Sequence, residues 1–238
     1  CEIECNRDSL GGSINIHGIE RYLGDMFQEK PLDSHKSADT NKSIAVIGSG
    51  PAGLSAAYQL ALQGHNVTVY EAQSMTGGML RLGIPDYRLP QDVLDSEIKR
   101  ISDLGVNIVT DTRVGTDITY EDLRSNNDAI FVAVGFTNSR TLGAENDDAS
   151  GVVPGIDVLR RINQGEPDGV GQRVMVVGGG NTAMDVSRSL LRLGKDVRVM
   201  YRRTRMEMPA IAEEIEELIE EGIEIDFGNH EAVMELAR

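Results

Sequence analysis

The 238-residue chain has only two cysteines, no tryptophan and few other aromatic residues. Both cysteines, Cys1 and Cys5, stand at its beginning. A disulfide scaffold is therefore not expected, and a reducing cytoplasm is the expected location. No apolar run approaches the ~20 residues that a membrane-spanning helix needs, and no secretory signal is visible. The length is sufficient to bury one large or two modest hydrophobic cores.

Basic residues are scarce relative to acidic ones. The chain has 23 Lys and Arg residues against 38 Asp and Glu residues, which gives a formal charge of −15. This charge argues against nucleic acid and anionic membrane surfaces as partners. The chain has no Gly-x-Ser-x-Gly motif, and its four histidines lack metal-ligand spacing. No pair of redox cysteines accompanies either of its two glycine-rich motifs, which disfavours thioredoxin-reductase chemistry.

Short apolar runs alternate with helical patterns along the chain. This alternation predicts an α/β fold with parallel sheets, in the form of two Rossmann-like domains. Strands are expected at 44–47, 67–70, 106–109, 129–134, 174–177, 197–200 and 223–227. Helices are expected at 17–30, after each glycine motif, at 91–104, from Pro154 and around 211–222. The expected parts are a helical segment with a polar linker (1–40), one nucleotide-binding domain (41–150) and a second one (151–238).

The first glycine motif follows the strand at 44–47. It consists of Gly48, Ser49, Gly50, Pro51, Ala52 and Gly53, and Glu71 ends the next strand 23 residues after Gly48. The three glycines permit a tight turn, close approach of a pyrophosphate, and close contact between helix and sheet. Phosphates bind at the positive end of such a helix, and a carboxylate at the position of Glu71 accepts hydrogen bonds from ribose. Glycine turns also occur for reasons of packing alone, but the flanking strand, helix and acid favour a dinucleotide site.

The second glycine motif has the same spacing and a different ending. It consists of Gly178, Gly179, Gly180, Asn181 and Thr182, with Ala183 in place of the third glycine. Tyr201 occupies the position equivalent to Glu71, and three arginines follow it: Arg202, Arg203 and Arg205. Guanidinium groups suit the 2′-phosphate of NADP, and a carboxylate there would repel it. The alternative is a solvated arginine cluster at the end of a strand; NADPH rather than NADH is the favoured ligand.

Between the two motifs, residues 77–90 read GGMLRLGIPDYRLP. Together with the first motif, Tyr70-Glu71-Ala72 and residues 201–210 (YRRTRMEMPA), this segment resembles the small (β) subunit of NADPH-dependent glutamate synthase. The same module is similar to the N-terminal part of dihydropyrimidine dehydrogenase and to large subunits of ferredoxin–NADP oxidoreductases. The resemblance covers nearly the whole chain.

The resemblance implies a flavoprotein oxidoreductase that holds both FAD and NADPH. FAD would lie along Gly48 to Gly53, with Glu71 on its ribose. Gly78, Met79 and Arg88 would contact the FAD phosphates or the flavin end, and the backbone of Val114 would contact the adenine. NADPH would use Gly179 to Thr182, then Arg202 and Arg203; Arg205 varies in the family. Hydride would pass between NADPH and FAD, and no side chain is identified as catalytic.

The resemblance also implies an iron–sulfur region around Cys1 and Cys5. A [4Fe–4S] cluster normally needs four ligands and this chain offers two, so ligation is expected only in a longer parent protein. Electrons would pass through such clusters to a partner subunit or domain. No Gly-Asp element that would close the flavin site appears near the end of the chain. One alternative is therefore a nucleotide-binding piece with no turnover of its own; another is a flavin monooxygenase or amine oxidase, against which residues 83–90 count.

Overall fold

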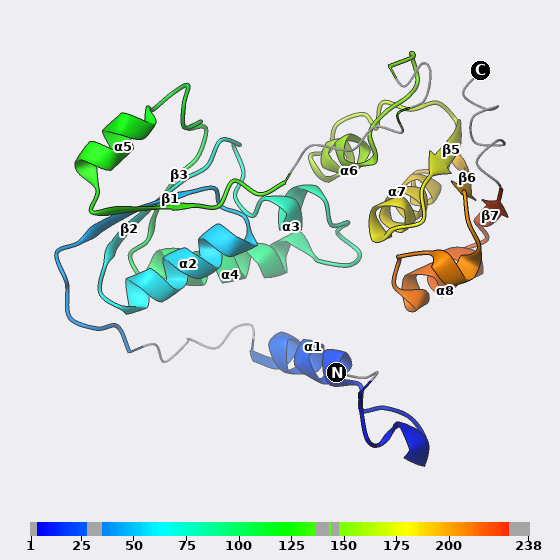
Figure 1. The fold of residues 1–238 in the computed structure, drawn as a ribbon, viewed down its shortest axis with the longest axis horizontal. Helices are drawn as coiled ribbons and strands as arrows, with labels where there is room; N and C mark the ends of the chain where they lie inside the picture. The colour runs from blue at the N-terminus through cyan, green and yellow to red at the C-terminus, as the bar shows by residue number, and fades with distance from the viewer. Residues whose placement is uncertain (1–3, 28–34, 137–142, 144–147, 229–238) are drawn as a thin grey trace.

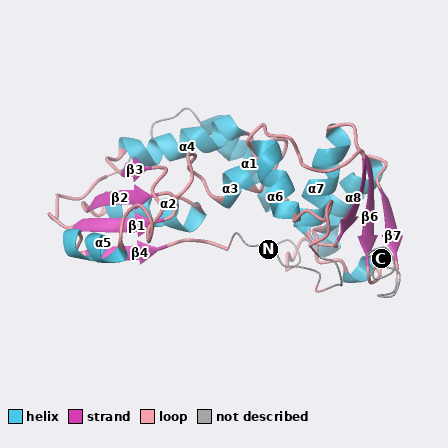
Figure 2. Cartoon of the chain, turned by 90° about the horizontal axis from the view of Figure 1, so that it is seen from above, coloured by secondary structure: helices cyan, strands magenta, loops and turns pink. Residues whose placement is uncertain are grey.

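The computed structural model describes residues 4–27, 35–136, 143 and 148–228 (Figure 1). It contains two separate parallel sheets, as the alternating pattern predicts. The first sheet has the order β3-β2-β1-β4 and the second has the order β5-β6-β7. Figure 2 shows the two sheets at opposite ends of the molecule, with helices between them. The α/β prediction with two Rossmann-like units is confirmed.

The first unit consists of four strands and four helices. Its strands are β1 (Ser43–Ile47), β2 (Asn66–Tyr70), β3 (Asn107–Val109) and β4 (Ala129–Val132), and its helices are α2 (Pro51–Leu62), α3 (Met79–Leu82), α4 (Gln91–Asp103) and α5 (Tyr120–Asn126). Helices α2 and α4 cover one face of the sheet and α5 covers the other (Figure 1). The buried side chains Val46, Val69 and Ala57 join the sheet to α2, and Leu123 of α5 packs on Ala45 from the opposite side.

Between residues 148 and 228, the second unit contains three strands and three α-helices. Its strands are β5 (Arg173–Val177), β6 (Asp196–Tyr201) and β7 (Glu224–Phe227), and its helices are α6 (Gly155–Asn163), α7 (Asn181–Arg192) and α8 (Ala212–Glu220), with a short 3-10 turn at Arg205–Glu207. Met184, Leu190, Val199 and Leu218 are among its most deeply buried side chains. The helix that was predicted to begin at Pro154 begins one residue later, at Gly155, and Pro154 is its N-cap residue with an extended ψ of 132°.

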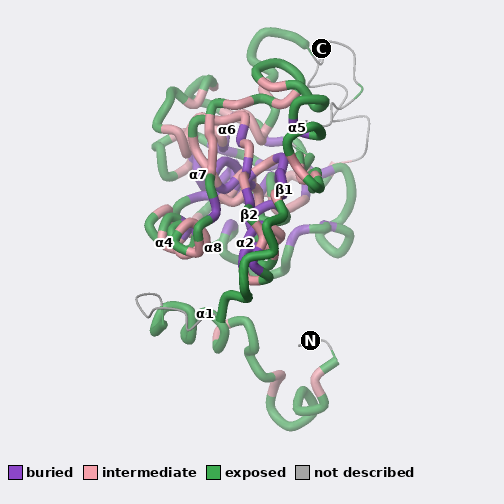
Figure 3. The backbone as a smooth tube through the Cα atoms, turned by 90° about the vertical axis from the view of Figure 1, so that its left-hand side faces the viewer, coloured by how far each residue is buried: buried purple, intermediate pink, exposed green. Residues whose placement is uncertain are grey.

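The amino-terminal residues stand apart from both units. They form a 3-10 turn at Asp8–Leu10 and helix α1 (Ile16–Phe27), and none of residues 4–27 is buried (Figure 3). The helix was predicted at 17–30, and residues 28–30 lie outside the described part of the chain. Arg100 of α4 donates a hydrogen bond to the carbonyl of Phe27 at 2.9 Å.

The end of β4 differs most from the prediction, since the other strand bounds agree to within one residue. The apolar run 129–134 indicated a strand to Val134, but β4 ends at Val132. The Ala133 N–H still donates to the Ile47 carbonyl at 2.8 Å. The last residue of β1, Ile47, is the register partner of Val132, and the chain turns at Gly48, so the pairing of β4 with β1 ends there.

Candidate nucleotide-binding sites

The first glycine turn is built so tightly that two of its positions exclude a side chain. Gly48 has a φ of +102°, and a Cβ placed on it would lie 2.4 Å from the Ala133 carbonyl oxygen. A Cβ on Gly53 would lie 1.9 Å from the carbonyl oxygen of Gly48. The third glycine is therefore required because α2 runs directly against the turn, which is the role predicted for it.

The outer side of this turn is open. A Cβ on Gly50 would meet nothing within 4 Å, and no side chain caps the start of α2. Pro51 and Ala52, the first helical residues, are exposed. The first amide groups of a helix lack partners within the helix, so an anion at this position could accept hydrogen bonds from them. The local backbone fits a pyrophosphate.

Glu71 lies directly beneath the turn and is buried. One carboxylate oxygen accepts hydrogen bonds from the Ser49 amide at 2.9 Å and the Ser49 hydroxyl at 2.5 Å. The other oxygen accepts the Gln73 amide at 2.8 Å. An ionised carboxylate has about four acceptor positions, so one remains for a ribose hydroxyl. The sequence analysis did not identify Ser49 as a partner of Glu71. The signal for this contact is a polar residue between the first two glycines of a motif whose next strand is followed by an acid.

Gly77 and Gly78 pack against the first glycine turn, whereas the contact of Gly78 with FAD that the family resemblance implies stays a prediction. The Gly77 amide donates to the Ser49 carbonyl and hydroxyl at 3.1 and 3.2 Å. A Cβ on Gly78 would lie 2.7 Å from the Cα of Gly50. Met79 then begins α3 beside the turn. Two segments 28 residues apart therefore form one surface around the expected phosphate position.

The structure shows other contacts for Val114 and Arg88. Val114 packs with Ile47 and Leu123 near the carboxyl end of the first sheet. Arg88 extends toward the second unit, where its guanidinium pairs with Asp185 at 2.9 Å and with Glu214 at 3.0 Å. A contact of Val114 or Arg88 with FAD stays a prediction.

The second glycine turn holds an aromatic ring where the first holds a carboxylate. A Cβ on Gly179 would lie 2.6 Å from ring atoms of Tyr201, so the ring packs directly on the turn. The Tyr201 hydroxyl donates to the Glu207 carbonyl at 2.7 Å. The Ala210 amide donates to the Gly179 carbonyl at 3.0 Å, which joins the segment after β6 to the same turn.

Helix α7 begins at this turn without a side-chain cap. Asn181, its first residue, uses its side-chain oxygen to accept the Ile211 amide at 2.9 Å, and so also holds the segment after β6. Thr182 lies beside α6, where a Cβ on Gly155 would be 3.6 Å from its methyl group. Gly178 has a φ of +146°, and a Cβ on Gly180 would be 3.9 Å from Pro209. The start of α7 is therefore also suited to an anion.

The three arginines that follow β6 are exposed. Arg205 lies 3.7 Å from Glu216, whereas neither Arg202 nor Arg203 forms an ion pair within the part of the chain that the structure describes. Thr204 donates to the Glu207 carboxylate through its amide and hydroxyl, and these bonds, with the Arg203 charge, lower the pKa of Glu207. The structure thus leaves two guanidinium groups available beside the second turn.

The predicted iron–sulfur ligands fall at the edge of what the structure covers. Cys1 lies outside the described residues, and Cys5 is half-buried in the amino-terminal segment. Among the residues that the structure describes, no three His, Cys, Asp or Glu side chains come close enough together to hold a metal ion. None of the described helices is both long and apolar enough to cross a membrane.

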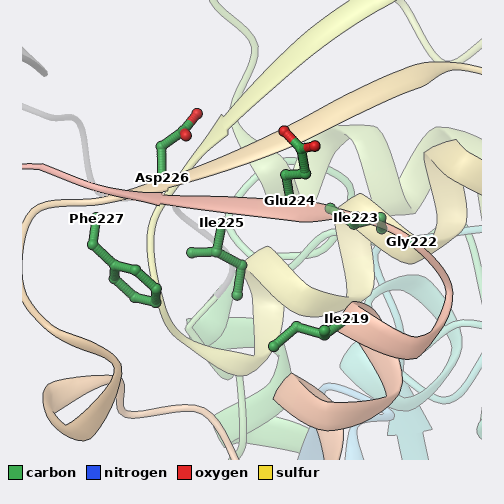
Figure 4. Close-up of a pocket in the computed structure, with 7 residues that line it drawn as sticks. All are labelled: Ile219, Gly222, Ile223, Glu224, Ile225, Asp226 and Phe227. Atoms are coloured by element: carbon green, nitrogen blue, oxygen red, sulfur yellow. The ribbon is translucent and has the colours of Figure 1, made fainter.

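A surface hollow runs along strand β7 (Figure 4). It is lined by Ile219, Gly222, Ile223, Glu224, Ile225, Asp226 and Phe227. None of these residues belongs to either motif, so the hollow is not assigned to nucleotide binding.

Residues 42–234 match the family model described as pyridine nucleotide-disulphide oxidoreductase. The chain is 43% identical over 236 residues to the NADPH-Fe(3+) oxidoreductase subunit beta of Geobacter sulfurreducens, with 95% of this chain and 35% of the relative aligned. It is 36% identical to the glutamate synthase [NADPH] small chain of Escherichia coli, with 95% of this chain and 51% of the relative aligned. The chain thus spans between a third and about half of the length of these relatives.

The fold also matches a solved structure, Mycobacterium tuberculosis FprA in complex with NADPH. The TM-score is 0.66 at 24% identity, and the match covers 76% of this chain and 48% of FprA. The predicted resemblance to glutamate synthase small subunits and the predicted oxidoreductase class are confirmed at the level of the family. With its paired glycine turns and parallel sheets, the chain belongs to the pyridine nucleotide-disulphide oxidoreductase family.

Proposed function

We propose that this chain is an NADPH-dependent flavin oxidoreductase module, with FAD on the first glycine turn and NADPH on the second. The observation that carries the proposal is the opposite chemistry at the two equivalent strand ends. The first ends in Glu71, a buried acceptor with a free lone pair, and the second ends in exposed arginines. An acceptor binds ribose hydroxyls, whereas guanidinium groups bind a phosphate ester.

FAD is the ligand proposed for the first unit, residues 41–150. The uncapped start of α2 would bind the pyrophosphate, and Glu71 would accept a hydroxyl of the adenosine ribose. Gly78 and Met79, held against Gly50, would extend this contact surface toward the flavin. Bound FAD supplies two-electron and one-electron redox chemistry, and the protein positions it.

NADPH is the ligand proposed for the second unit, residues 151–238. Gly178 to Thr182 would bind its pyrophosphate, and Arg202 and Arg203 would bind the 2′-phosphate. Both guanidinium groups are exposed and without ion-pair partners among the described residues, so neither must first break an ion pair. The printed names of the Geobacter and Escherichia coli relatives, both of which specify NADPH, support this choice.

We further propose that electrons leave the flavin for a partner subunit or domain through iron–sulfur clusters, with Cys1 and Cys5 as cluster ligands in a longer parent protein. Both relatives are named as one subunit of a larger enzyme, which supports a partner. The scarcity of cysteine is typical of proteins from a reducing cytoplasm, which is the location we propose.

The first experiment tests cofactor binding and turnover. The purified chain, supplied with FAD, is expected to show a flavin absorption spectrum that NADPH bleaches under anaerobic conditions. A protein that binds NADPH but shows neither flavin absorbance nor diaphorase activity would support the alternative of a nucleotide-binding piece without turnover.

The second experiment tests the assignment of the arginines. The double variant Arg202→Ala/Arg203→Ala is expected to raise the Kd for NADPH at least about tenfold, because charge-assisted hydrogen bonds contribute roughly 1.5–3 kcal/mol each. The Kd for NADH should change little. Arg198→Ala is the matched control, since Arg198 is an exposed arginine of β6 that already pairs with Glu224 and Asp226. Equal losses for NADPH and NADH would contradict the assignment.

A further inference from the structure

The segment between α3 and α4 reaches from the first unit to the second through Arg88. Its guanidinium donates to both carboxylate oxygens of Asp185 on α7, each at 2.9 Å. A second nitrogen lies 3.0 Å from Glu214 on α8. One side chain of the first unit thus binds two helices of the second.

These partners are poorly hydrated. The side chains of Asp185 and Glu214 are only 7% and 13% exposed. Burial raises the pKa of Asp185, and the hydrogen bonds and charge of Arg88 act in the opposite direction. A buried carboxylate that loses its partner is costly, so the arrangement of the two units that keeps Arg88 in place is favoured over arrangements that separate them.

The other charged side chains near Arg88 and Asp185 form ion pairs within the second unit. Arg188, nearly buried on α7, pairs with Glu214, Glu217 and Glu221 at 2.6–2.8 Å. Arg192 also pairs with Glu221, at 2.8 Å. Among the described residues, Arg88 is therefore the only cation paired with Asp185.

Two neighbouring contacts join the same segment to the second unit. The ring of Tyr87 lies beneath Arg192 and Arg188 of α7, with guanidinium carbons 3.9 and 5.0 Å from its centroid. Asn163 of α6 donates to the carbonyl oxygens of Arg81 and Ile84, both at 2.9 Å. Segment 81–88 therefore contacts all three α-helices of the second unit.

Segment 81–88 is connected to the first glycine turn through α3 and to the second glycine turn through α7. It continues from α3, whose start at Gly78 rests on Gly50 of the first turn. Asp185 lies one helical turn beyond Asn181 and Thr182, the residues with which α7 leaves the second turn. Figure 1 shows α3, α6 and α7 in the space between the two sheets. A short, largely helical path thus connects the two expected phosphate positions.

We propose that Arg88 and Asp185, supported by Glu214 and Tyr87, form an inter-unit clasp that fixes the position of the second unit over the first. In the proposed flavoenzyme, this clasp would position the nicotinamide for hydride transfer to the flavin. Arg88 and Asp185 are in that role positioning residues. The effect on hydride transfer rests on the proposed function; the positional role does not.

The positional role is tested by a distance measurement that needs no cofactor. Spin labels are introduced at Lys99→Cys on α4 and Glu220→Cys on α8, two exposed positions, with Cys1 and Cys5 replaced by serine. Pulsed electron spin resonance on the labelled chain is expected to give one narrow distance peak. Asp185→Asn should lose that peak in favour of a broad distribution, because the amide cannot hold the guanidinium as an ion pair.

Glu217→Gln is the matched control, because it removes a carboxylate that binds Arg188 within the second unit alone. It should retain the narrow peak. Glu214→Gln is a second clasp variant and should broaden the peak if Asp185→Asn does not fold. The proposal is overturned if the clasp variants that fold keep the narrow peak, or if Glu217→Gln broadens it equally.

The catalytic consequence is tested by anaerobic stopped-flow reduction of the FAD-loaded chain. Asp185→Asn is expected to lower the limiting rate of flavin reduction about tenfold, since small errors in the placement of reacting groups are costly. The Kd for NADPH, taken from the concentration dependence, and the FAD content should stay near the parent values. Arg88→Lys, which keeps the charge, should lower the limiting rate of flavin reduction less than Asp185→Asn does.

A rise in the Kd for NADPH with an unchanged limiting rate in Asp185→Asn would instead assign Asp185 to NADPH binding. Failure of NADPH to reduce the parent chain would overturn the proposed function and leave the distance result in force.

Discussion

The two glycine motifs have the same residue spacing. They differ at two positions that contact each other, namely the second residue of the motif and the residue at the end of the next strand. In the first, Ser49 lies between the glycines and bonds to Glu71, the residue that ends the neighbouring strand. In the second, Gly179 takes the place of Ser49 and Tyr201 takes the place of Glu71. In the first unit a hydroxyl therefore contacts a carboxylate. In the second unit a glycine, which has no side chain, leaves room for an aromatic ring.

The difference shows how one backbone turn is adapted to two ligands. In the first unit the polar pair keeps an acceptor at the strand end, directed at the position expected for ribose. In the second unit the ring of Tyr201 fills the position equivalent to that of the Glu71 carboxylate. The chain then continues into exposed Arg202 and Arg203. Under the proposed assignment, the shared backbone would bind what all dinucleotides have in common, and the strand end would select between them.

The largest effect is expected from exchanging the third residue of the motif. Gly53→Ala should destabilise the first unit by about 3 kcal/mol, because the new Cβ would lie 1.9 Å from a backbone oxygen that cannot move freely. The converse change, Ala183→Gly, should cost about 1 kcal/mol through helix propensity. Urea unfolding followed by circular dichroism measures both. Similar losses of stability in the two variants would contradict the inference that α2 approaches its glycine turn more closely than α7 does.

The next effect concerns the polar pair of the first turn. Ser49→Ala removes a hydrogen bond to a buried carboxylate and should cost roughly 2 kcal/mol. Isothermal titration should also show weaker FAD binding, because Glu71 would lose one of the groups that orient it. Ser55→Ala, one helical turn further along α2, is the control. Unchanged stability in Ser49→Ala would mean that the backbone amides of Ser49 and Gln73 suffice to hold Glu71.

A smaller effect is expected at the aromatic pair of the second turn. Tyr201→Phe keeps the ring on Gly179 and removes only the hydrogen bond to the Glu207 carbonyl. The loss of stability should be about 1 kcal/mol, with the NADPH-to-NADH preference retained. Thermal unfolding and Kd measurements check this result. A loss of the preference would show that the hydroxyl, rather than the arginines, carries the selectivity.

The smallest effect is a pH dependence confined to the second unit. The Thr204 hydrogen bonds and the Arg203 charge hold the pKa of Glu207 below its ordinary value. A lowered folded-state pKa gives a contribution that is present above the unfolded pKa and is lost as pH falls through the folded pKa. The amide resonance of Thr204 should therefore shift in acid, below the usual glutamate range. In Glu207→Gln this shift should be absent; its persistence would contradict the assignment.

Much of this arrangement could be predicted from local sequence. Glycine spacing, the apolar runs and the strand-end residues identified both turns and the parallel sheets, because each feature depends on a few neighbouring residues. The end of β4 was predicted wrongly because an apolar run continues as a strand only while a neighbouring strand accompanies it. Ser49 was missed because its importance depends on a partner 22 residues away.

The sequence by itself determined the two glycine turns, the acid after one and the arginines after the other, since turn geometry and strand ends are encoded locally. Only the tertiary structure decided that Arg88 pairs with Asp185, 97 residues further along, and that Tyr201 packs on Gly179. Such partners are chosen when separate elements fold against each other and bury their charges and rings together. No local pattern records which residues will meet there.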